Sequence, residues 1–528
     1  MRFLLLVTLV LYCNEVEMSN ILALFPLPQY SHTSNFMPIF KALASRGHNV
    51  TVVSPFPQKT PVPNLNDIVI RNDWDHIVSY FTLSDVIKMS ERLFQLKFIW
   101  EVGDKLSQLA LSNEYVQKLI RDKHTKFDLI LLETFAFQEP LVAFGYKFNA
   151  PVINLHPCIL SASASHFVGN SIPFSYSPTR FSTFSDRMTF LERVETAFFH
   201  TWDLLMYSIY HIRRQDHLMR KYLQHSELPN LPPLADMLRN TSLTLINHNS
   251  AVGYPLPLHK NVIEFGGINV KSGGKLPKDL QEIMDSAVYG VIYFNFGSIF
   301  NLSALPEETQ TSIISALGKV KRRVLIKWNT LPANVKLPEN IEFRKWYPQS
   351  SILAHPNCKL FITHGGVASI MEGIYHAVPL LLVPLFSDQK YNAKYAEGRG
   401  DGEVLYLEDL NEDNLFNSIN RVLDNTRYKE NIQKHSAIFK DQPIDTLEHV
   451  IYWIEYVIRH RGAAHLRPAV LDLYWYQYLM LDVIAFYTSI VFLILYIVKS
   501  VLCLIFRTVR RIIRKRNCEK DLNKSKKE

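Results

Sequence analysis

Hydrophobic and polar positions along the chain predict two successive blocks of alternating strands and helices. The first block begins with the apolar run Asn20–Phe25, the helically spaced apolar positions of Phe36–Ser45 and a second apolar run, Asn49–Ser54. A strand, a helix and a second strand at this spacing form a βαβ unit, which begins a doubly wound parallel sheet. Phe127–Leu132 and Asn149–Leu155 are predicted as later strands of the same sheet.

The second block follows a linker rich in glycine and lysine, residues 266–278. At 528 residues the chain is too long for one core. We therefore expect an N-terminal domain over 20–265 and a C-terminal domain over 266–470, whose final helices could pack back on the first domain. The second block is predicted to contain the strands Val291–Phe296, Val324–Trp328, Ile341–Trp346, Lys359–Thr363 and Leu380–Val383 and the helices Pro306–Lys319 and Gly366–His376.

The N-terminus has the pattern of a signal peptide. Arg2 precedes the apolar run Phe3–Tyr12, which is too short to span a bilayer. We predict a signal peptide over residues 1–19, cleaved between Cys13 and Asn20. A buried first strand is the alternative, but Ile21–Phe25 fits that place better.

The C-terminus has the pattern of a membrane anchor. Val483–Val498 is uncharged, and with its flanks it predicts a transmembrane region over 478–506. The tail over 507–528 has ten Lys/Arg against three Asp/Glu. The positive-inside rule then places this tail in the cytosol and the body in the lumen, as in a type I protein. Lysines near the end match a retrieval signal of the endoplasmic reticulum. A buried core helix is the alternative.

The distribution of charge and cysteines argues against three kinds of site, and one sequon is a candidate for glycosylation. Because the net charge of +8 comes almost entirely from the tail, a basic groove for nucleic acid is not expected in the body. Cys158 and Cys358, the cysteines of the body, are far apart and lack metal-ligand spacing, so we expect neither a disulfide framework nor a metal site. Asn240, in a plausible turn, is the favoured glycosylation site.

Two residues of the first block are candidates for acid–base chemistry. His32 lies in a predicted loop after the first strand, and Glu133 follows Phe127–Leu132. Open α/β sheets bind ligands at the carboxyl ends of their strands, and imidazole titrates near neutral pH. Glu133 could hold the His32 ring in one tautomer. A solvated loop histidine and a helix-capping or sheet-edge acid are the alternatives.

Two further segments of the first block differ in their patterns. Ser161–Ser185 is rich in serine and aromatic residues and is predicted as loop. Arg187–Arg214 combines helical spacing with many large apolar residues. It could line an apolar acceptor pocket, lie against a membrane surface, or form an ordinary core helix.

The stretch from Trp346 to Gln389 has the residues expected of a sugar-nucleotide site. An aromatic ring can stack on a base, a glycine-opened helix start can bind phosphates, and the acid–amide pair at its end can bind a sugar. A second glycine, Gly297, ends a strand before a helix and could also let backbone N–H groups approach a diphosphate. The candidates are Ser298, Trp346, Gln349, His364, Gly365, Gly366, Ser369, Glu372, Asp388 and Gln389.

The motifs WYPQ, ITHGG, EG and DQ within this stretch closely resemble the signature of the UDP-glycosyltransferases, which include animal glucuronosyltransferases and plant glycosyltransferases. The resemblance covers essentially the whole chain. It implies a GT-B fold, with two Rossmann-like domains facing a cleft. It also implies these roles: Trp346 stacks on uracil and Gln349 binds the nucleoside; His364, Ser369 and Ser298 meet the diphosphate; Glu372 holds the ribose; Asp388 and Gln389 hold the donor sugar; His32 is the catalytic base.

The resemblance further implies an inverting transfer of a hexose from a UDP-sugar to the hydroxyl of a small lipophilic acceptor, for detoxification or for hormone or pigment conjugation. The UDP-sugar is a co-substrate, and no permanently bound cofactor or metal is expected. Vertebrate members have aspartate at the position of Glu133, and the chain resembles insect members here. This resemblance to insect members favours UDP-glucose over UDP-glucuronate. A second copy of the chain is a candidate partner. A silent member that binds lipophiles or a protein, and a transferase for lipid or protein glycans, are the alternatives.

Overall fold

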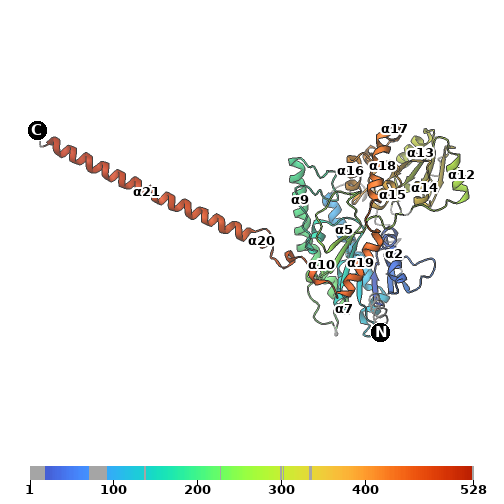
Figure 1. Ribbon diagram of the computed structural model, residues 1–528, viewed down its shortest axis with the longest axis horizontal. Coiled ribbons are helices and arrows are strands. Elements are labelled where there is room, and N and C mark those ends of the chain that lie inside the picture. The colour runs from blue at the N-terminus through green and yellow to red at the C-terminus, as the bar shows by residue number, and fades with distance from the viewer. Residues whose placement is uncertain are drawn as a thin grey trace, which may run out of the picture. The chain divides into compact units, whose positions relative to one another are not determined.

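The computed structural model describes residues 18–70, 92–135, 138–225, 228–270, 272–297, 300, 302–331 and 336–525 (Figure 1). The predicted signal peptide therefore lies almost entirely outside the described residues. The chain divides into two compact units, Met1–Pro468 and Ala469–Glu528.

The described strands of the first block form a parallel seven-stranded sheet with the order β3-β2-β1-β4-β5-β6-β7. Successive residues of β1 point to opposite faces: Ile21 and Ala23 belong to one apolar cluster, and Leu22 and Leu24 to another. Both faces are therefore buried, as is usual for parallel sheets. The strands are β1 (Asn20–Leu24), β2 (Asn49–Ser54), β3 (Leu65–Val69), β4 (Leu129–Leu132), β5 (Val152–His156), β6 (Leu243–Ile246) and β7 (Val262–Glu264).

Helices cover both faces of this first sheet. The helices α2 (Tyr30–Ser45) and α19 (Thr446–Arg459) pack together on one face (Figure 1). Arg46, next to α2, donates a hydrogen bond of 3.0 Å to Glu455 of α19, which is 409 positions away in the sequence. The last helix of the body therefore belongs to the first core. The other face contacts the helices α5 (Arg92–Ser112), α6 (Glu114–Arg121), α7 (Ala143–Phe148), α10 (Ile212–Leu223) and α11 (Leu234–Arg239).

The second block forms a parallel sheet of six described strands in the order β10-β9-β8-β11-β12-β13. Two apolar clusters bury its faces between the surrounding helices. The strands are β8 (Val291–Asn295), β9 (Arg323–Lys327), β10 (Ile341–Arg344), β11 (Cys358–Thr363), β12 (Leu380–Leu382) and β13 (Gly402–Val404). The helices are α12 (Lys278–Ser286), α13 (Glu307–Gly318), α14 (Gln349–Ala354), α15 (Val367–Tyr375), α16 (Gln389–Gly398), α17 (Glu412–Asp424) and α18 (Thr426–Lys440).

Two loop predictions are wrong. The helix α2 begins at Tyr30, so His32 lies in its first turn rather than in a loop. The sequence does not indicate where α2 starts, because Gln29 provides no side-chain cap and the polar residues of its first turns show no apolar spacing. Within Ser161–Ser185 the short helix α8 (Ala162–Phe167) forms, capped by the Ser161 side chain. The helical segment that follows is α9 (Phe190–Met206), a π-helical turn over Tyr207–His211, and α10.

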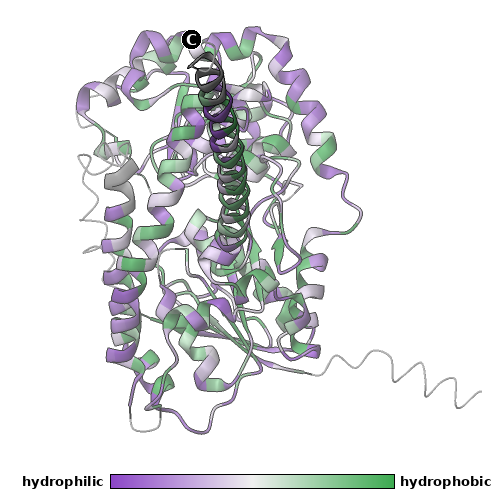
Figure 2. Ribbon diagram, turned by 90° about the vertical axis from the view of Figure 1, so that its left-hand side faces the viewer, coloured by the Kyte–Doolittle hydropathy of each residue, from purple (hydrophilic) through white to green (hydrophobic). Residues whose placement is uncertain are grey.

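The second unit contains α20 (Trp475–Tyr478) and the long helix α21 (Leu481–Ser525). Within it, Leu481–Cys518 is long and apolar enough to cross a membrane, with a mean hydropathy of 2.6 in its most apolar window. Figure 2 colours the helix largely hydrophobic along its first part and hydrophilic toward its end. None of that window is buried within the second unit.

Candidate active site

His32 and Glu133 form a buried, hydrogen-bonded pair. They follow β1 and β4, which are neighbours in the sheet, so the parallel register brings both to one carboxyl edge. His32 Nδ1 lies 2.5 Å from Glu133 Oε1, and the two side chains are 11% and 1% exposed. Donation from Nδ1–H leaves the Nε2 lone pair as a proton acceptor. The second carboxylate oxygen, Oε2, is buried and has no hydrogen-bond partner among the described residues.

A second histidine, His156, lies at the end of β5 behind this pair. The Phe135 ring separates the two histidines, with centroid distances of 5.5 Å to His32 and 6.1 Å to His156. Burial, together with the charges of Arg180 and His32, lowers the pKa of His156 to about 3. His156 is therefore neutral at physiological pH and a weaker base than an ordinary imidazole.

The second sheet presents its candidates in the segments after four of its strands, β8, β10, β11 and β12. The loop after β11 contains His364, which precedes the N-terminus of α15. Burial and the nearby Lys327 lower the pKa of His364 to about 4, so the ring is neutral and can donate one hydrogen bond. Gly297, after β8, has φ +80°, and an added Cβ would lie 2.8 Å from the His364 ring. Glycine is therefore required at this position.

The predicted anion site lies at the start of α15. Gly366 is the N-cap of α15 and Ser369 lies in its first turn. An added Cβ at Gly366 would approach His364 Nε2 to 2.7 Å, and Gly365 has φ +85°. These glycines allow the chain to turn tightly around the imidazole. Ser298, the remaining candidate for the diphosphate, lies outside the described residues.

Gln349 and Glu372 are joined directly. The Gln349 amide donates to one Glu372 oxygen, and Ser350 donates to the other. Gln349 in turn accepts a hydrogen bond of 2.7 Å from Asn295. Burial raises the pKa of the Glu372 carboxyl, although both hydrogen bonds oppose the shift. The polar network fixes both side chains in place before any sugar hydroxyl is bound.

Trp346 provides an exposed aromatic surface beside this network. Its side chain is 63% exposed. The Lys327 ammonium lies 5.7 Å from the ring centroid and donates to the Gly297 carbonyl oxygen. Tyr30 from the first helix meets the indole edge at a centroid distance of 6.3 Å. A flat ring and a cation are thus adjacent, as a nucleoside diphosphate requires.

Asp388 and Gln389 begin α16, after β12. Asp388 accepts a hydrogen bond of 2.8 Å from Asn392, while burial raises the pKa of its carboxyl. The Gln389 oxygen accepts the backbone N–H groups of Leu385 and Phe386 at 2.8 and 3.1 Å. The oxygen of Gln389 is therefore engaged by its own loop, which leaves the amide N–H groups to meet a ligand.

The two sheet edges face each other at this point. The charges of His32 and Arg180 both act on the Asp388 carboxyl, although Asp388 belongs to the second sheet. Tyr254 and Tyr391 are in ring contact at 5.2 Å beside it. The structure thus brings together the pair on the first sheet and the acid–amide pair on the second.

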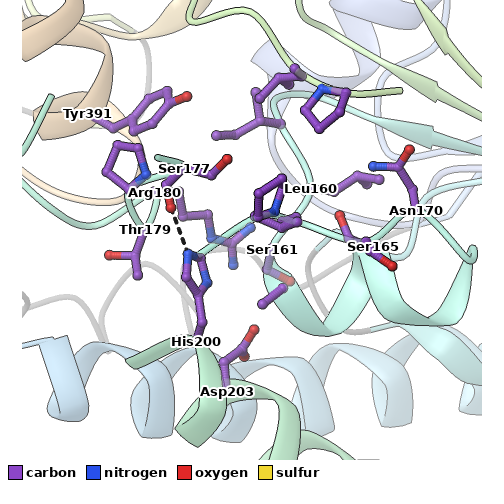
Figure 3. A pocket seen from close by; sticks show the side chains of 18 of the residues that line it. Leu160, Ser161, Ser165, Asn170, Ser177, Thr179, Arg180, His200, Asp203 and Tyr391 are labelled. Carbon is purple, nitrogen blue, oxygen red and sulfur yellow. Dashed lines mark hydrogen bonds between the residues drawn. The ribbon is translucent and has the colours of Figure 1, made fainter. Parts of the chain in front are cut away.

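A largely apolar cavity lies next to this junction (Figure 3). It encloses about 800 Å³, including its open mouth, and Tyr391 from α16 closes part of its wall. Phe199, His200 and Asp203 from α9 also line it. His200 donates a hydrogen bond of 2.9 Å to the Ser177 carbonyl oxygen.

Helix α9 is inverted in its polarity. Its buried residues are polar: Thr196, His200 and Asp203. Its exposed residues include Phe190, Leu191, Val194, Phe198, Trp202 and Leu205. An ordinary core helix has the opposite distribution, so that alternative is wrong for α9. One side of the helix lines the cavity and the other presents apolar side chains outward.

Three polar residues at the junction escaped the sequence analysis: Lys327, Asn295 and Arg180. Lys327 ends β9 and Asn295 ends β8, so their places at the carboxyl edges of predicted strands could have identified them. Arg180 lies in an irregular segment, where no periodic signal exists. Asn240, the glycosylation candidate, is exposed at the end of α11. Among the described residues, no group of three or more His, Cys, Asp or Glu could hold a metal ion.

Comparison with known proteins identifies close sequence relatives. Residues 22–516 match the family model described as "UDP-glucoronosyl and UDP-glucosyl transferase". UDP-glucosyltransferase 2 of Dactylopius coccus is 36% identical over 513 residues, which cover 95% of this chain and 97% of the relative. UDP-glucuronosyltransferase 1A6 of Mus musculus is 37% identical over 403 residues, which cover 72% of this chain and 71% of the relative.

Solved structures share the fold at low sequence identity. The calicheamicin glycosyltransferase CalG4 matches with a TM-score of 0.55 and 16% identity, over 85% of this chain and 100% of its own. A UDP-glucose: anthocyanidin 3-O-glucosyltransferase in complex with UDP matches with a TM-score of 0.52 and 16% identity, over 83% of this chain and 99% of its own. The expectation of two Rossmann-like sheets in a GT-B arrangement is confirmed.

Proposed function

The chain belongs to the family of UDP-glucuronosyl and UDP-glucosyl transferases, and we propose that it is an inverting enzyme that transfers a hexose from a UDP-sugar to the hydroxyl of a small lipophilic acceptor. The observation that carries the proposal is the buried His32–Glu133 pair, joined by a hydrogen bond of 2.5 Å; the charge of His32 also acts on the Asp388 carboxyl of the donor half. A base and a sugar-binding acid from different sheets are then within reach of one reacting centre.

The reaction is a single displacement at the anomeric carbon. His32 Nε2 accepts the proton of the acceptor hydroxyl while Glu133 holds Nδ1–H and stabilises the imidazolium. The oxygen attacks the anomeric carbon from the face opposite the diphosphate, and UDP leaves with the bonding electrons. The backbone N–H groups at the start of α15 and the neutral His364 ring donate hydrogen bonds to the diphosphate.

The donor half holds the remainder of the UDP-sugar. In this proposal Trp346 stacks on the uracil, and Gln349 and Glu372, already joined to each other, meet the nucleoside and ribose. Ser369 and Ser298 add hydroxyls to the diphosphate site, and Asp388 and Gln389 bind the hexose. We favour glucose, because the relative from Dactylopius coccus is named a UDP-glucosyltransferase.

The cellular setting follows from the chain ends. We propose that α21 anchors the protein in the membrane of the endoplasmic reticulum, with the body in the lumen, the basic tail in the cytosol and a glycan on exposed Asn240. The outward apolar face of α9 suits the membrane surface as well. Conjugation of lipophilic compounds for detoxification, or of hormones or pigments, fits this setting.

A donor panel tests the function. Membranes containing the full chain receive UDP-glucose or UDP-glucuronate with one neutral phenol, and the glycoside is measured. Transfer from UDP-glucose that exceeds transfer from UDP-glucuronate supports the proposal. A chain that binds UDP yet transfers neither sugar would instead be a silent binding protein. If lipid or protein glycans accept the sugar and the phenol does not, the acceptor class is wrong.

A further inference from the structure

Arg180 is a buried cation at the junction of the two halves. It lies in the segment between α8 and α9, and only 6% of its surface is exposed. Its Nε is buried and has no hydrogen-bond partner among the described residues. Burying a charge costs free energy unless the charge is paired, and the side-chain hydrogen bond of Arg180 to Cys158 does not provide an anion, so a buried guanidinium without an ion pair among the described residues points to an anionic ligand.

The buried acids near Arg180 are all engaged elsewhere. Glu133 is bonded to His32, and Asp388 to Asn392. Glu139 accepts hydrogen bonds from Tyr207 and His211, and Asp203 accepts the backbone N–H of Ser163. None of these carboxylates forms an ion pair with Arg180 among the described residues, although the charge of Arg180 acts on the Asp388 carboxyl.

Aromatic rings fix the orientation of the guanidinium. Arg180 lies over the Phe135 ring at 4.9 Å and over the Phe181 ring at 4.8 Å. Such stacking uses the flat faces of a guanidinium and partly offsets its burial. The N–H groups point along the plane, which leaves the edge for an in-plane ligand. A carboxylate matches that edge with two parallel hydrogen bonds.

The guanidinium also borders open space. Arg180 lines the large cavity shown in Figure 3 and a second one of about 450 Å³, which His156 and Thr134 line as well. Phe135, on which Arg180 stacks, also contacts the His32 ring. A ligand held by Arg180 in the cavity would therefore lie close to the proposed base.

We propose that Arg180 binds a carboxylate of the substrate and selects acceptors that carry an acidic group in addition to the reacting hydroxyl, such as phenolic acids. The inference rests on the proposed function and names the substrate class for the same site. A carboxylate at this position could come from the acceptor or from a uronic donor sugar. The acceptor is favoured because the cavity walls come mostly from the first half.

The test compares acid and neutral acceptors of equal size. Full-chain enzyme in membranes is assayed with a hydroxycinnamic acid and with its primary amide, and the ratio of the two kcat/KM values is measured. Wild type is expected to prefer the acid, and Arg180→Met to reduce this preference about 10- to 100-fold, the usual range for a charged hydrogen-bonded pair. Arg180→Lys keeps the charge without the planar fork and should retain part of the preference.

Parallel arms separate the alternatives. With the amide as acceptor, a fall in the ratio of kcat/KM for UDP-glucuronate to that for UDP-glucose in Arg180→Met, without a change in the ratio of acid to amide, would assign the carboxylate to the donor and overturn the inference. An equal fall for acid and amide, or unchanged ratios in Arg180→Met and Arg180→Lys, would overturn the inference. Arg187→Met, which removes an exposed arginine seven positions further on, is the matched control and should leave every ratio unchanged. If wild type transfers sugar to neither acceptor, the proposed function fails instead.

Discussion

The two halves of the proposed active site differ in the number of residues on which each proposed role depends. On the first sheet, the proposed acid–base chemistry depends on one buried pair, His32 and Glu133, joined by one hydrogen bond of 2.5 Å. On the second, proposed donor binding is distributed over the segments after β8, β10, β11 and β12, where several residues each make a separate contact. Removing one partner of a pair abolishes its action, whereas removing one contact of many weakens binding by a limited amount. The two halves should therefore respond differently to mutation.

Replacement of the proposed base should have the largest effect. In His32→Ala no group accepts the hydroxyl proton, and kcat is expected to fall about 10²- to 10⁴-fold. UDP binding should remain, because the donor residues lie on the other sheet. Glycoside formation is measured in membranes, and UDP affinity by protection against thermal unfolding. An unchanged rate of sugar transfer in this variant would contradict the assignment of His32 as the base.

Loss of charge at Glu133 should have a smaller effect. Glu133→Gln keeps the size of the side chain but cannot stabilise the imidazolium, and kcat is expected to fall about 10²-fold. Glu133→Asp keeps the charge and shortens the reach, so it should retain more activity than the amide. Steady-state rates of the two variants provide the check. If the amide is the more active variant, orientation rather than charge is the contribution of Glu133.

A single donor contact should matter less again. Stacking on an aromatic ring contributes about 1–3 kcal/mol per base, so Trp346→Ala should raise KM for the UDP-sugar about 5- to 150-fold with little change in kcat. Trp346→Phe keeps a flat surface and serves as the control. A variant whose kcat falls while KM stays constant would show that Trp346 takes no part in donor binding.

The smallest predicted effect concerns stability in acid, where the two halves behave alike. His156 and His364 have pKa values lowered to about 3 and about 4. Between pH 6.5 and about 4 the unfolded chain binds protons that the folded chain does not, so the free energy of unfolding falls as pH falls. Each imidazole contributes about 1.4 kcal/mol per pH unit.

The comparison of wild type with His364→Asn isolates one of these groups. The melting temperature of the His364→Asn variant, recorded from pH 7.5 to 5, should fall less steeply than that of the wild type. Other titrating groups are common to both proteins and cancel in the difference. Parallel curves would mean that His364 does not carry the acid sensitivity.

The proposed donor site was predictable from sequence in greater detail than the proposed acceptor site. Its residues follow strands with strong apolar runs, and a parallel sheet delivers every such loop to one edge. Trp346, His364, Glu372 and Asp388 could therefore be named in advance as candidates. Arg180, in contrast, lies in an irregular segment, and nothing in its local sequence indicates that it is buried.

The sequence by itself determined the two parallel sheets, the long apolar helix near the end and the candidates at the strand ends, because hydrophobic spacing is a local property. Only the tertiary structure decided which side chains meet. It joined His32 to Glu133 across 101 positions, packed α19 on the first sheet, placed Asp388 within the influence of His32, and left Arg180 stacked between two rings. These pairings depend on contacts between segments that are distant in the chain, and such contacts leave no periodic pattern in a single sequence.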